Sequence, residues 1–151
     1  MKVMAYVEGC LDKVLLEQLL RKSCRTDQYY VEIQITGGGE APMRQALDEI
    51  SNNIGKYVII AIDSDDMPRE KVKTFENMLS EAGIEIIKKE EIDKTNKTIT
   101  LYRVNVTKDS SVNVILLQWH PTAEGILWRA LYESKGCEEV LPPRCCVNEM
   151  F

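Results

Sequence analysis

Six consecutive residues with apolar or aromatic side chains, Tyr57 to Ile62, stand in the middle of the chain. An uninterrupted run of this length is typical of a strand that other elements cover on both faces, as at the centre of a parallel sheet. Three acids follow it directly, at Asp63, Asp65 and Asp66. The run therefore predicts an α/β fold and places carboxylates at the end of a central strand.

The segments on either side of this run alternate between the periodicities of strands and helices. Alternating strands and helices predict an open, mainly parallel, Rossmann-like sheet with helices on its faces. We expect strands over 2–7, 30–36 and 85–88, and helices over 11–22, 42–53 and 68–82.

The pattern changes further along the chain. Residues 89–97 are polar and charged and predict a loop. Residues 98–107 and 112–119 predict the two strands of a β-hairpin. A final helix is expected over 122–135. The expected fold class is thus α/β with a C-terminal β-hairpin and helix.

Length and composition narrow the class of protein. The 151 residues fit a single domain, 1–151, and 44% hydrophobic with 28% charged residues is ordinary for a globular protein. No apolar run approaches the roughly 18 residues of a membrane span, and the N-terminus becomes acidic too early for a signal peptide. The five cysteines include no Cys-x-x-Cys pair, so we expect no disulfide framework and a cytoplasmic location. The net charge of −5 argues against a protein that coats nucleic acid by bulk attraction.

Acids follow two of the expected strands at the same edge of the sheet. Glu8 comes directly after the first strand and Asp63 directly after the third. In parallel sheets, ligands bind outside the carboxyl ends of the strands. Two carboxylates about 4 Å apart repel by about 4 kcal/mol at an effective dielectric of about 20, so protonation, an Arg or Lys side chain, or a cation must relieve the repulsion. Mg²⁺ suits such oxygen ligands, with Mn²⁺ as the alternative ion. Asp66 either extends this metal site or caps the following helix.

Three motifs stand in order along the chain: a strand that ends in Glu-Gly with an acid three residues later, a glycine turn, and a strand that ends in Asp-x-Asp. They read Tyr6-Val7-Glu8-Gly9-Cys10-Leu11-Asp12, Ile35-Thr36-Gly37-Gly38 and Ile59-Ile60-Ala61-Ile62-Asp63-Ser64-Asp65. Together they resemble the Toprim domain, which is shared by topoisomerases, bacterial-type primases, overcoming-lysogenization-defect nucleases and small ribosomal-RNA maturation nucleases. The resemblance covers about residues 2–88.

The resemblance implies a Toprim-type sheet and a role for each acid. It implies Glu8 as a general acid/base or metal-associated group, and Asp63 and Asp65 as Mg²⁺ ligands. Many members carry a glycine three residues after the second aspartate, where this chain has Pro68. That departure bears on how closely a substrate backbone approaches. Some Toprim nucleases use an additional acid from a later segment, a role that Glu124 would fill.

Further residues near this edge are candidates for contact with a phosphate. Gly9 allows a sharp turn after the first strand. The backbone N–H groups of Gly37 and Gly38 precede a helix, where anions bind, although a plain loop is the alternative. Lys13, Arg69 and Lys71 either contact substrate or belong to the solvated surface, and the sequence favours the surface for each of them.

His120 is the single histidine of the chain and is followed by a proline. This context favours a loop or capping role over that of a catalytic base.

Three functions stay open. The first is Mg²⁺-dependent phosphoryl transfer on nucleic acid, as a Toprim-type nuclease or nucleotidyl-transferring module. The second is a non-catalytic module of the same shape that binds nucleic acid or a protein. The third is a phosphatase of the haloacid dehalogenase type, since Ile60-Ala61-Ile62-Asp63-Ser64-Asp65 also resembles its first motif, with Asp63 as nucleophile. We expect DNA or RNA as the partner and no membrane, and we expect residues 89–151 to set specificity or to form a homodimer.

Overall fold

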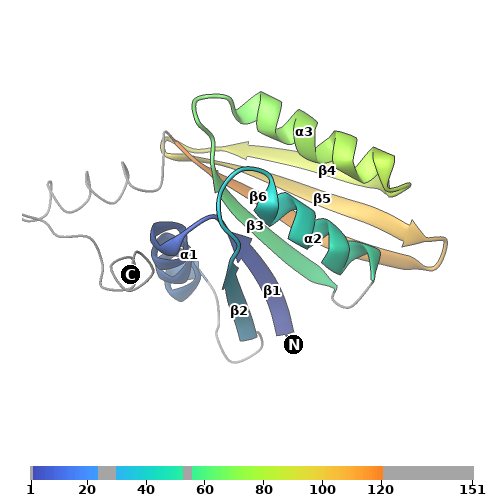
Figure 1. The fold of residues 1–151 in the computed structure, drawn as a ribbon, viewed down its shortest axis with the longest axis horizontal. Helices are drawn as coiled ribbons and strands as arrows, with labels where there is room; N and C mark the ends of the chain where they lie inside the picture. The colour runs from blue at the N-terminus through green and yellow to red at the C-terminus, as the bar shows by residue number, and fades with distance from the viewer. Residues whose placement is uncertain (1, 24–29, 53–55, 121–151) are drawn as a thin grey trace, which may run out of the picture.

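The computed structural model describes residues 2–23, 30–52 and 56–120, which form strands and helices in alternation and then a hairpin (Figure 1). The predicted helix over 122–135, with Glu124 in it, lies outside the described residues. No helix in the described ranges is long and apolar enough to cross a membrane. In chain order the elements are β1 (Lys2–Val7), α1 (Cys10–Ser23), β2 (Tyr30–Ile35), α2 (Ala41–Ser51), β3 (Tyr57–Asp63), α3 (Pro68–Glu81), β4 (Glu85–Asp93), β5 (Lys97–Thr107) and β6 (Ser110–Trp119).

The strands form one mixed sheet in the order β2-β1-β3-β6-β5-β4. β1, β2, β3 and β6 pair in parallel, whereas β5 is antiparallel to both of its neighbours, β6 and β4. β3 lies inside the parallel part, and Val58 to Ile62 are all buried, as the apolar run predicted. The described chain is therefore α/β, with a mixed six-stranded sheet flanked by helices.

The neighbour of β3 on the side away from β1 is β6, the last strand in the chain. The register places Asp63 opposite Trp119. α3 packs over this inserted hairpin, since the ring of Phe75 meets that of Tyr102 on β5 edge to face at 5.6 Å. Local periodicity predicts strands but does not specify which strands pair, so this order has no signal in the sequence.

β4 extends to Asp93 and β5 begins at Lys97, so the loop predicted over 89–97 is wrong for residues 89–93 and 97. β4 is an edge strand, and most of its side chains are exposed. An edge strand needs no apolar alternation, and charged side chains such as Lys89 and Glu90 protect it from pairing with other chains. The polar composition that predicted a loop belongs instead to an edge strand.

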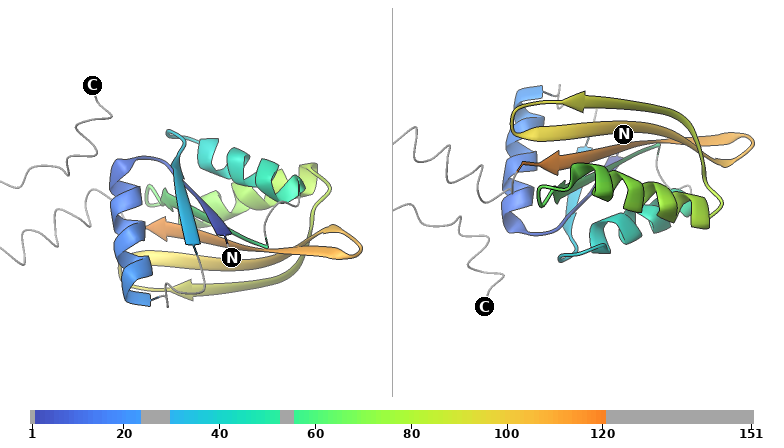
Figure 2. Two further views of the ribbon diagram at one scale, coloured as in Figure 1. Left: turned by 90° about the horizontal axis from the view of Figure 1, so that it is seen from below. Right: turned by 90° about the horizontal axis from the view of Figure 1, so that it is seen from above.

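Helices cover both faces of the sheet and enclose two separate cores (Figure 2). α2 and α3 pack on one face, where Ile50 and Phe75 are fully buried with Ile60 and Leu116 of the sheet. α1 crosses the other face, where Leu16 is buried among residues of β1, β3 and β6. The chain thus leaves β1 over one face and enters β3 from the other. Ligands of α/β sheets bind where connections diverge in this way, outside the carboxyl ends of the strands.

The contact between α3 and the hairpin yields a stability prediction. Phe75→Ala should lower the free energy of unfolding by about 3–5 kcal/mol, because it leaves a cavity at a side chain that is fully buried. Urea denaturation measures the loss. Ile87→Ala is the control, since Ile87 is 49% exposed and its truncation should cost little. Equal losses in the two variants would contradict the packing of α3 on β5.

Candidate functional site

The pairing of β1 with β3 brings the first two predicted acids together. Val7 lies opposite Ala61, so Glu8, the next residue, leaves β1 beside the end of β3. The carboxylate of Glu8 accepts a hydrogen bond from the backbone N–H of Asp63. The prediction that these two residues meet at one edge of the sheet therefore agrees with the geometry.

Asp12 is a third acid at this edge, and it is 5% exposed. It lies in the first turn of α1, and its Oδ2 accepts a hydrogen bond from the backbone N–H of Gly9 at 3.0 Å. This is the side-chain half of a capping box, in which an acid reaches back to the start of its own helix. The other oxygen, Oδ1, is buried and meets no partner among the described residues. Within the acidic cluster of Glu8, Asp12 and Asp63, one carboxylate oxygen of Asp12 therefore accepts a hydrogen bond and the other accepts none from the described residues.

Burial and mutual repulsion shift the pKa values of two of these carboxyls. Burial, and then the nearby charge of Asp63, raise the pKa of Glu8 to about 7, although Lys71 opposes the shift. Burial, followed by the charges of Asp63 and Glu8, raises the pKa of Asp12 to about 7. Both effects disfavour the ionised form of an acid. Near neutral pH the cluster therefore exchanges protons, and a bound cation would relieve the same repulsion.

The Asp-Ser-Asp-Asp segment forms a tight turn between β3 and α3. The N–H of Met67 donates to the carbonyl of Ser64 at 2.8 Å, and the two residues between them, Asp65 and Asp66, have φ of +51° and +58°. Positive φ at both central positions defines a type I′ turn, and Asp adopts this region more readily than most residues. The N-cap of α3 is Met67, without a side-chain cap, so the capping alternative for Asp66 does not apply. Asp65 and Asp66 are both exposed at this edge.

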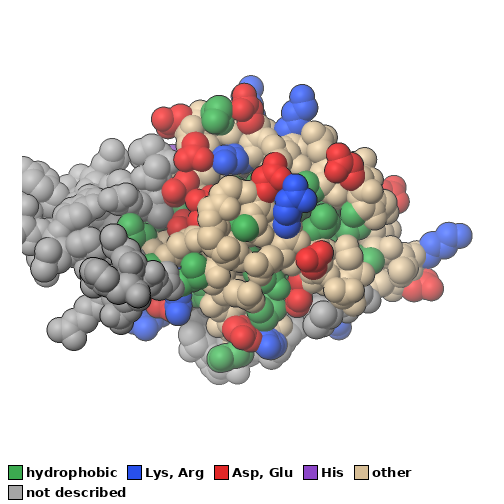
Figure 3. All heavy atoms as spheres, in the orientation of Figure 1, with side chains coloured by type: hydrophobic (Ala, Val, Ile, Leu, Met, Phe, Trp, Pro, Cys, Tyr) green, Lys and Arg blue, Asp and Glu red, His purple; other side chains and the backbone are tan. Residues whose placement is uncertain are grey.

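Lys71, on α3, brings a positively charged side chain to the site. Its Nζ lies 3.1 Å from Oδ2 of Asp65, and its charge lowers the pKa of Glu8. The sequence interpretation favoured solvated surface for Lys71. The signal it lacked was the direction of α3, whose first turns return over the edge where the acids lie. Acidic side chains gather with a basic one where β3 ends and α3 begins (Figure 3).

The remaining predicted residues have unequal places. Gly37 has φ of +95°, and its N–H donates to the backbone carbonyl of Glu8 at 3.0 Å, so the glycine turn is joined to the end of β1. Gly38 is exposed. Lys13 is half-buried and Arg69 exposed, and neither forms an ion pair within the part of the chain that is described.

Cys10, directly after Gly9, is buried and disulfide-bonded, which departs from the reduced thiols expected from the sequence. Every other cysteine is at least 14 residues away, the nearest being Cys24. Pairings over such separations leave no local spacing signal.

The donor set of the cluster fits a divalent cation. Mg²⁺ is usually held by one or two carboxylates together with water and substrate phosphate, and Asp63 and Asp65 supply such oxygens. The described residues contain no group of three or more His, Cys, Asp or Glu side chains that is already arranged around one ion. Without an ion, protonation of Glu8 and Asp12, whose pKa values are raised to about 7, relieves part of the repulsion. The ion pair of Lys71 with Asp65 offsets another part.

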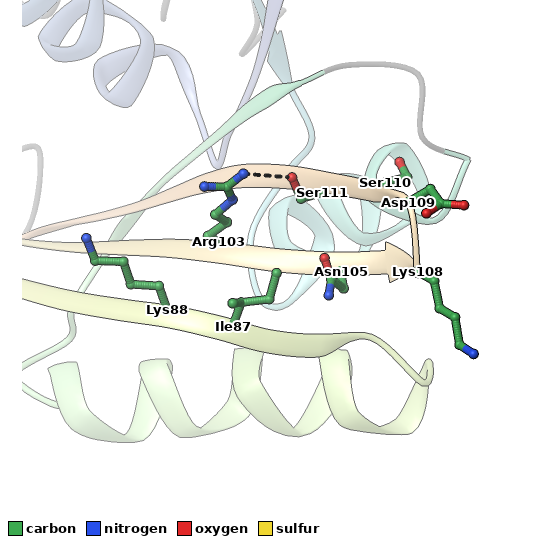
Figure 4. A pocket seen from close by; sticks show the side chains of 8 residues that line it. All are labelled: Ile87, Lys88, Arg103, Asn105, Lys108, Asp109, Ser110 and Ser111. Carbon is green, nitrogen blue, oxygen red and sulfur yellow. Dashed lines mark hydrogen bonds between the residues drawn. The ribbon is translucent and has the colours of Figure 1, made fainter.

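A separate groove of about 550 Å³ lies along β4 and the β5–β6 turn (Figure 4). Lys88 and Arg103 lie opposite each other in the strand register, and Lys108 lies at the turn. From Ser111, which accepts a hydrogen bond from Arg103 Nη2 at 3.4 Å, β6 runs eight residues to Trp119, a span of about 26 Å. The groove therefore lies at the opposite end of the sheet from the acids. Its lining residues are Ile87, Lys88, Arg103, Asn105, Lys108, Asp109, Ser110 and Ser111.

Comparison with protein-family models and with curated proteins finds no match to this chain.

The raised pKa of Asp12 predicts an unusual dependence of stability on pH. The folded state keeps the Asp12 proton up to about pH 7, whereas the unfolded chain releases it near 3.8. The stabilisation is therefore fully present below about pH 4 and is lost as the pH rises through 7. Asn does not ionise. In metal-free buffer, Asp12→Asn should therefore abolish this pH-dependent change in the free energy of unfolding, which is on the order of 2–4 kcal/mol.

Urea denaturation of the wild type and Asp12→Asn at pH 5 and pH 8 measures the difference. Asp48→Asn is the control, because Asp48 is exposed on α2. The same fall between pH 5 and pH 8 in all three proteins would contradict the raised pKa of Asp12.

Proposed function

We propose that this chain is a Toprim-like domain that carries out metal-dependent phosphoryl transfer on nucleic acid, as a nuclease or nucleotidyl-transferring module. The observation that carries the proposal is the crowding of Glu8, Asp12 and Asp63 where β1 and β3 end, a place where burial, and then mutual repulsion, raises the pKa values of Glu8 and Asp12 to about 7. The first and third of the motifs that resemble the Toprim family contribute these acids.

Asp63 and Asp65 would hold the ion, Mg²⁺ or Mn²⁺, with Asp66 exposed next to them. The ion, when bound, supplies positive charge that stabilises a phosphate in its transition state. An acidic chain with a net charge of −5 can then act on a polyanion. Phosphate contacts by Gly9, Gly37, Gly38, Lys13 or Arg69 remain part of the proposal.

Glu8 is suited to moving a proton. Its pKa of about 7 leaves both the protonated and the ionised form populated near neutral pH, which is the range in which general acid/base catalysis is most effective. The hydrogen bond from the backbone N–H of Asp63 fixes one side of its carboxylate. Lys71 holds Asp65 in place and adds positive charge close to Glu8.

The metal site is tested by calorimetric titration with Mn²⁺ and Mg²⁺. Asp63→Asn should lose measurable binding, because it removes one proposed ligand while keeping the size of the side chain. Asp48→Asn, an exposed acid on α2, should bind as the wild type does. Equal binding by the wild type and Asp63→Asn would rule out Asp63 as a ligand.

Catalysis is tested with a panel of labelled single- and double-stranded DNA and RNA in Mg²⁺ and Mn²⁺. We expect turnover of at least one substrate, and a loss of about 100- to 10,000-fold in Glu8→Gln, since a positioned acid/base group contributes that much. Glu85→Gln, at an exposed glutamate on β4, is the matched control.

A second candidate function is a non-catalytic module that binds nucleic acid. The groove favours it, because Lys88, Arg103 and Lys108 form no ion pair with any described residue. In the same panel, binding without turnover that is weakened by Arg103→Glu, but not by Arg21→Glu on α1, would support this function over catalysis. The dependence of the binding affinity on salt concentration should become weaker with each phosphate contact that is lost.

A further inference from the structure

The Asp-Ser-Asp-Asp segment, residues 63–66, is called the acid turn below. Ser64 lies inside it and is completely buried, between the exposed Asp65 and the half-buried Asp63. Its backbone N–H donates to the carbonyl of Trp119 at 2.9 Å. Its hydroxyl oxygen lies 2.7 Å from Nδ1 of His120. The end of β6 therefore contacts Ser64 through both the main chain and a side chain.

His120 joins this contact to the turn between β4 and β5. Its backbone N–H donates to the carbonyl of Asn96 at 2.8 Å, and its ring Nε2 lies 2.5 Å from Oγ1 of Thr98. The hydroxyl of Thr98 donates in turn to Oδ1 of Asp93 at 3.1 Å. Thr98 is itself buried. Four side chains from separate segments thus form one continuous relay.

The number of hydrogens sets the direction of this relay. Thr98 has one hydroxyl hydrogen, which it donates to Asp93, so toward His120 it can only accept. Nε2 of His120 must therefore carry a hydrogen. In the neutral ring the other nitrogen, Nδ1, then has none and accepts the hydroxyl hydrogen of Ser64. Every donor in the relay points toward the carboxylate of Asp93.

We propose that His120 is a positioning residue for the acid turn. With Thr98 and Asp93 it fixes Ser64, and thereby the proposed metal ligands Asp63 and Asp65 on either side. The role at the metal site rests on the proposed function.

The backbone after Ser64 gives this positioning a purpose. Asp65 and Asp66 both have positive φ, a conformation that costs free energy in residues other than glycine, although less in Asp than in most, and two such residues in succession need support from their surroundings. Ser64 is the last residue before this pair, and it is held by Trp119 and His120 together. Release of Ser64 would let the turn relax and would separate the carboxylates.

The tautomer of His120 is the first test. The chain has one histidine, so ¹⁵N labelling of histidine gives the signals of a single ring. Long-range ¹H–¹⁵N correlation spectra should show hydrogen on Nε2 and none on Nδ1 in the neutral ring. Hydrogen on Nδ1 of the neutral ring in the wild type would overturn the relay, whatever the protein binds.

Mn²⁺ affinity is the second test, with Thr98→Val and Thr100→Val as matched variants. Both threonines are buried on β5 and differ by two positions, so they share one face of the strand. The hydroxyl of Thr100 has no partner among the described residues, so its removal should change affinity by less than twofold. Thr98→Val and Ser64→Ala should weaken Mn²⁺ binding at least tenfold, the usual cost of removing an outer support of a metal ligand. His120→Asn should recover part of the affinity lost in His120→Ala, because its amide oxygen can accept from Ser64.

The outcomes separate this proposal from the proposed function. If the wild type binds Mn²⁺ and the two threonine variants bind equally well, His120 has no positioning role although the metal site stands. If the wild type binds no Mn²⁺, the metal site fails, and backbone chemical shifts of Asp65 and Asp66 decide about positioning. Loss of positive φ in Thr98→Val but not in Thr100→Val supports it, and unchanged shifts in both overturn it.

Discussion

The parallel pairing of β1 with β3 is the constraint on which the rest of the site depends. In this register Val7 lies opposite Ala61. Glu8, directly after β1, therefore lies beside Asp63, the last residue of β3. α1 occupies one face of the sheet and α2 with α3 the other. The first turn of α1 adds Asp12, and the start of α3 adds Lys71. One strand pair thus determines where four elements deliver charge.

This arrangement lowers the stability of the folded chain, because buried acids of like charge repel each other. The cores on the two faces offset that cost, with residues such as Phe75, Ile60 and Leu16 fully removed from solvent. Strain is concentrated at the same place, since Asp65 and Asp66 adopt positive φ next to the repelling carboxylates. Repulsion and backbone strain at one edge, supported by a well-packed interior, are typical of a site that is selected for binding or chemistry.

Local signals predicted the elements that local physics controls. The apolar run at Tyr57–Ile62 predicted the buried strand, and helical periodicity predicted the three helices that enclose the cores. Glu8 and Asp63 could be placed at one edge because parallel strands end on the same side of a sheet. Lys71 could not be placed there from the sequence, because its position depends on the direction of α3. His120 could not be placed there either, because its position depends on the insertion of β6 beside β3. The polar residues of β4 were misassigned for the same reason, since only the strand order makes β4 an edge.

The insertion of the β5–β6 hairpin changes what the second half of the chain contributes. The family resemblance ends near residue 88, which suggested that later residues form an accessory segment. Yet β6 pairs with β3 along its whole length, from Asn113 to Trp119, and ends where Asp63 ends. Because β5 and β4 follow in the same sheet, the turn between them lies next to His120, whose N–H reaches Asn96. Residues from both halves of the chain therefore hold the turn that carries Asp63, Ser64, Asp65 and Asp66. A fragment that ended at residue 88 would keep these acids but lose the residues that contact Ser64.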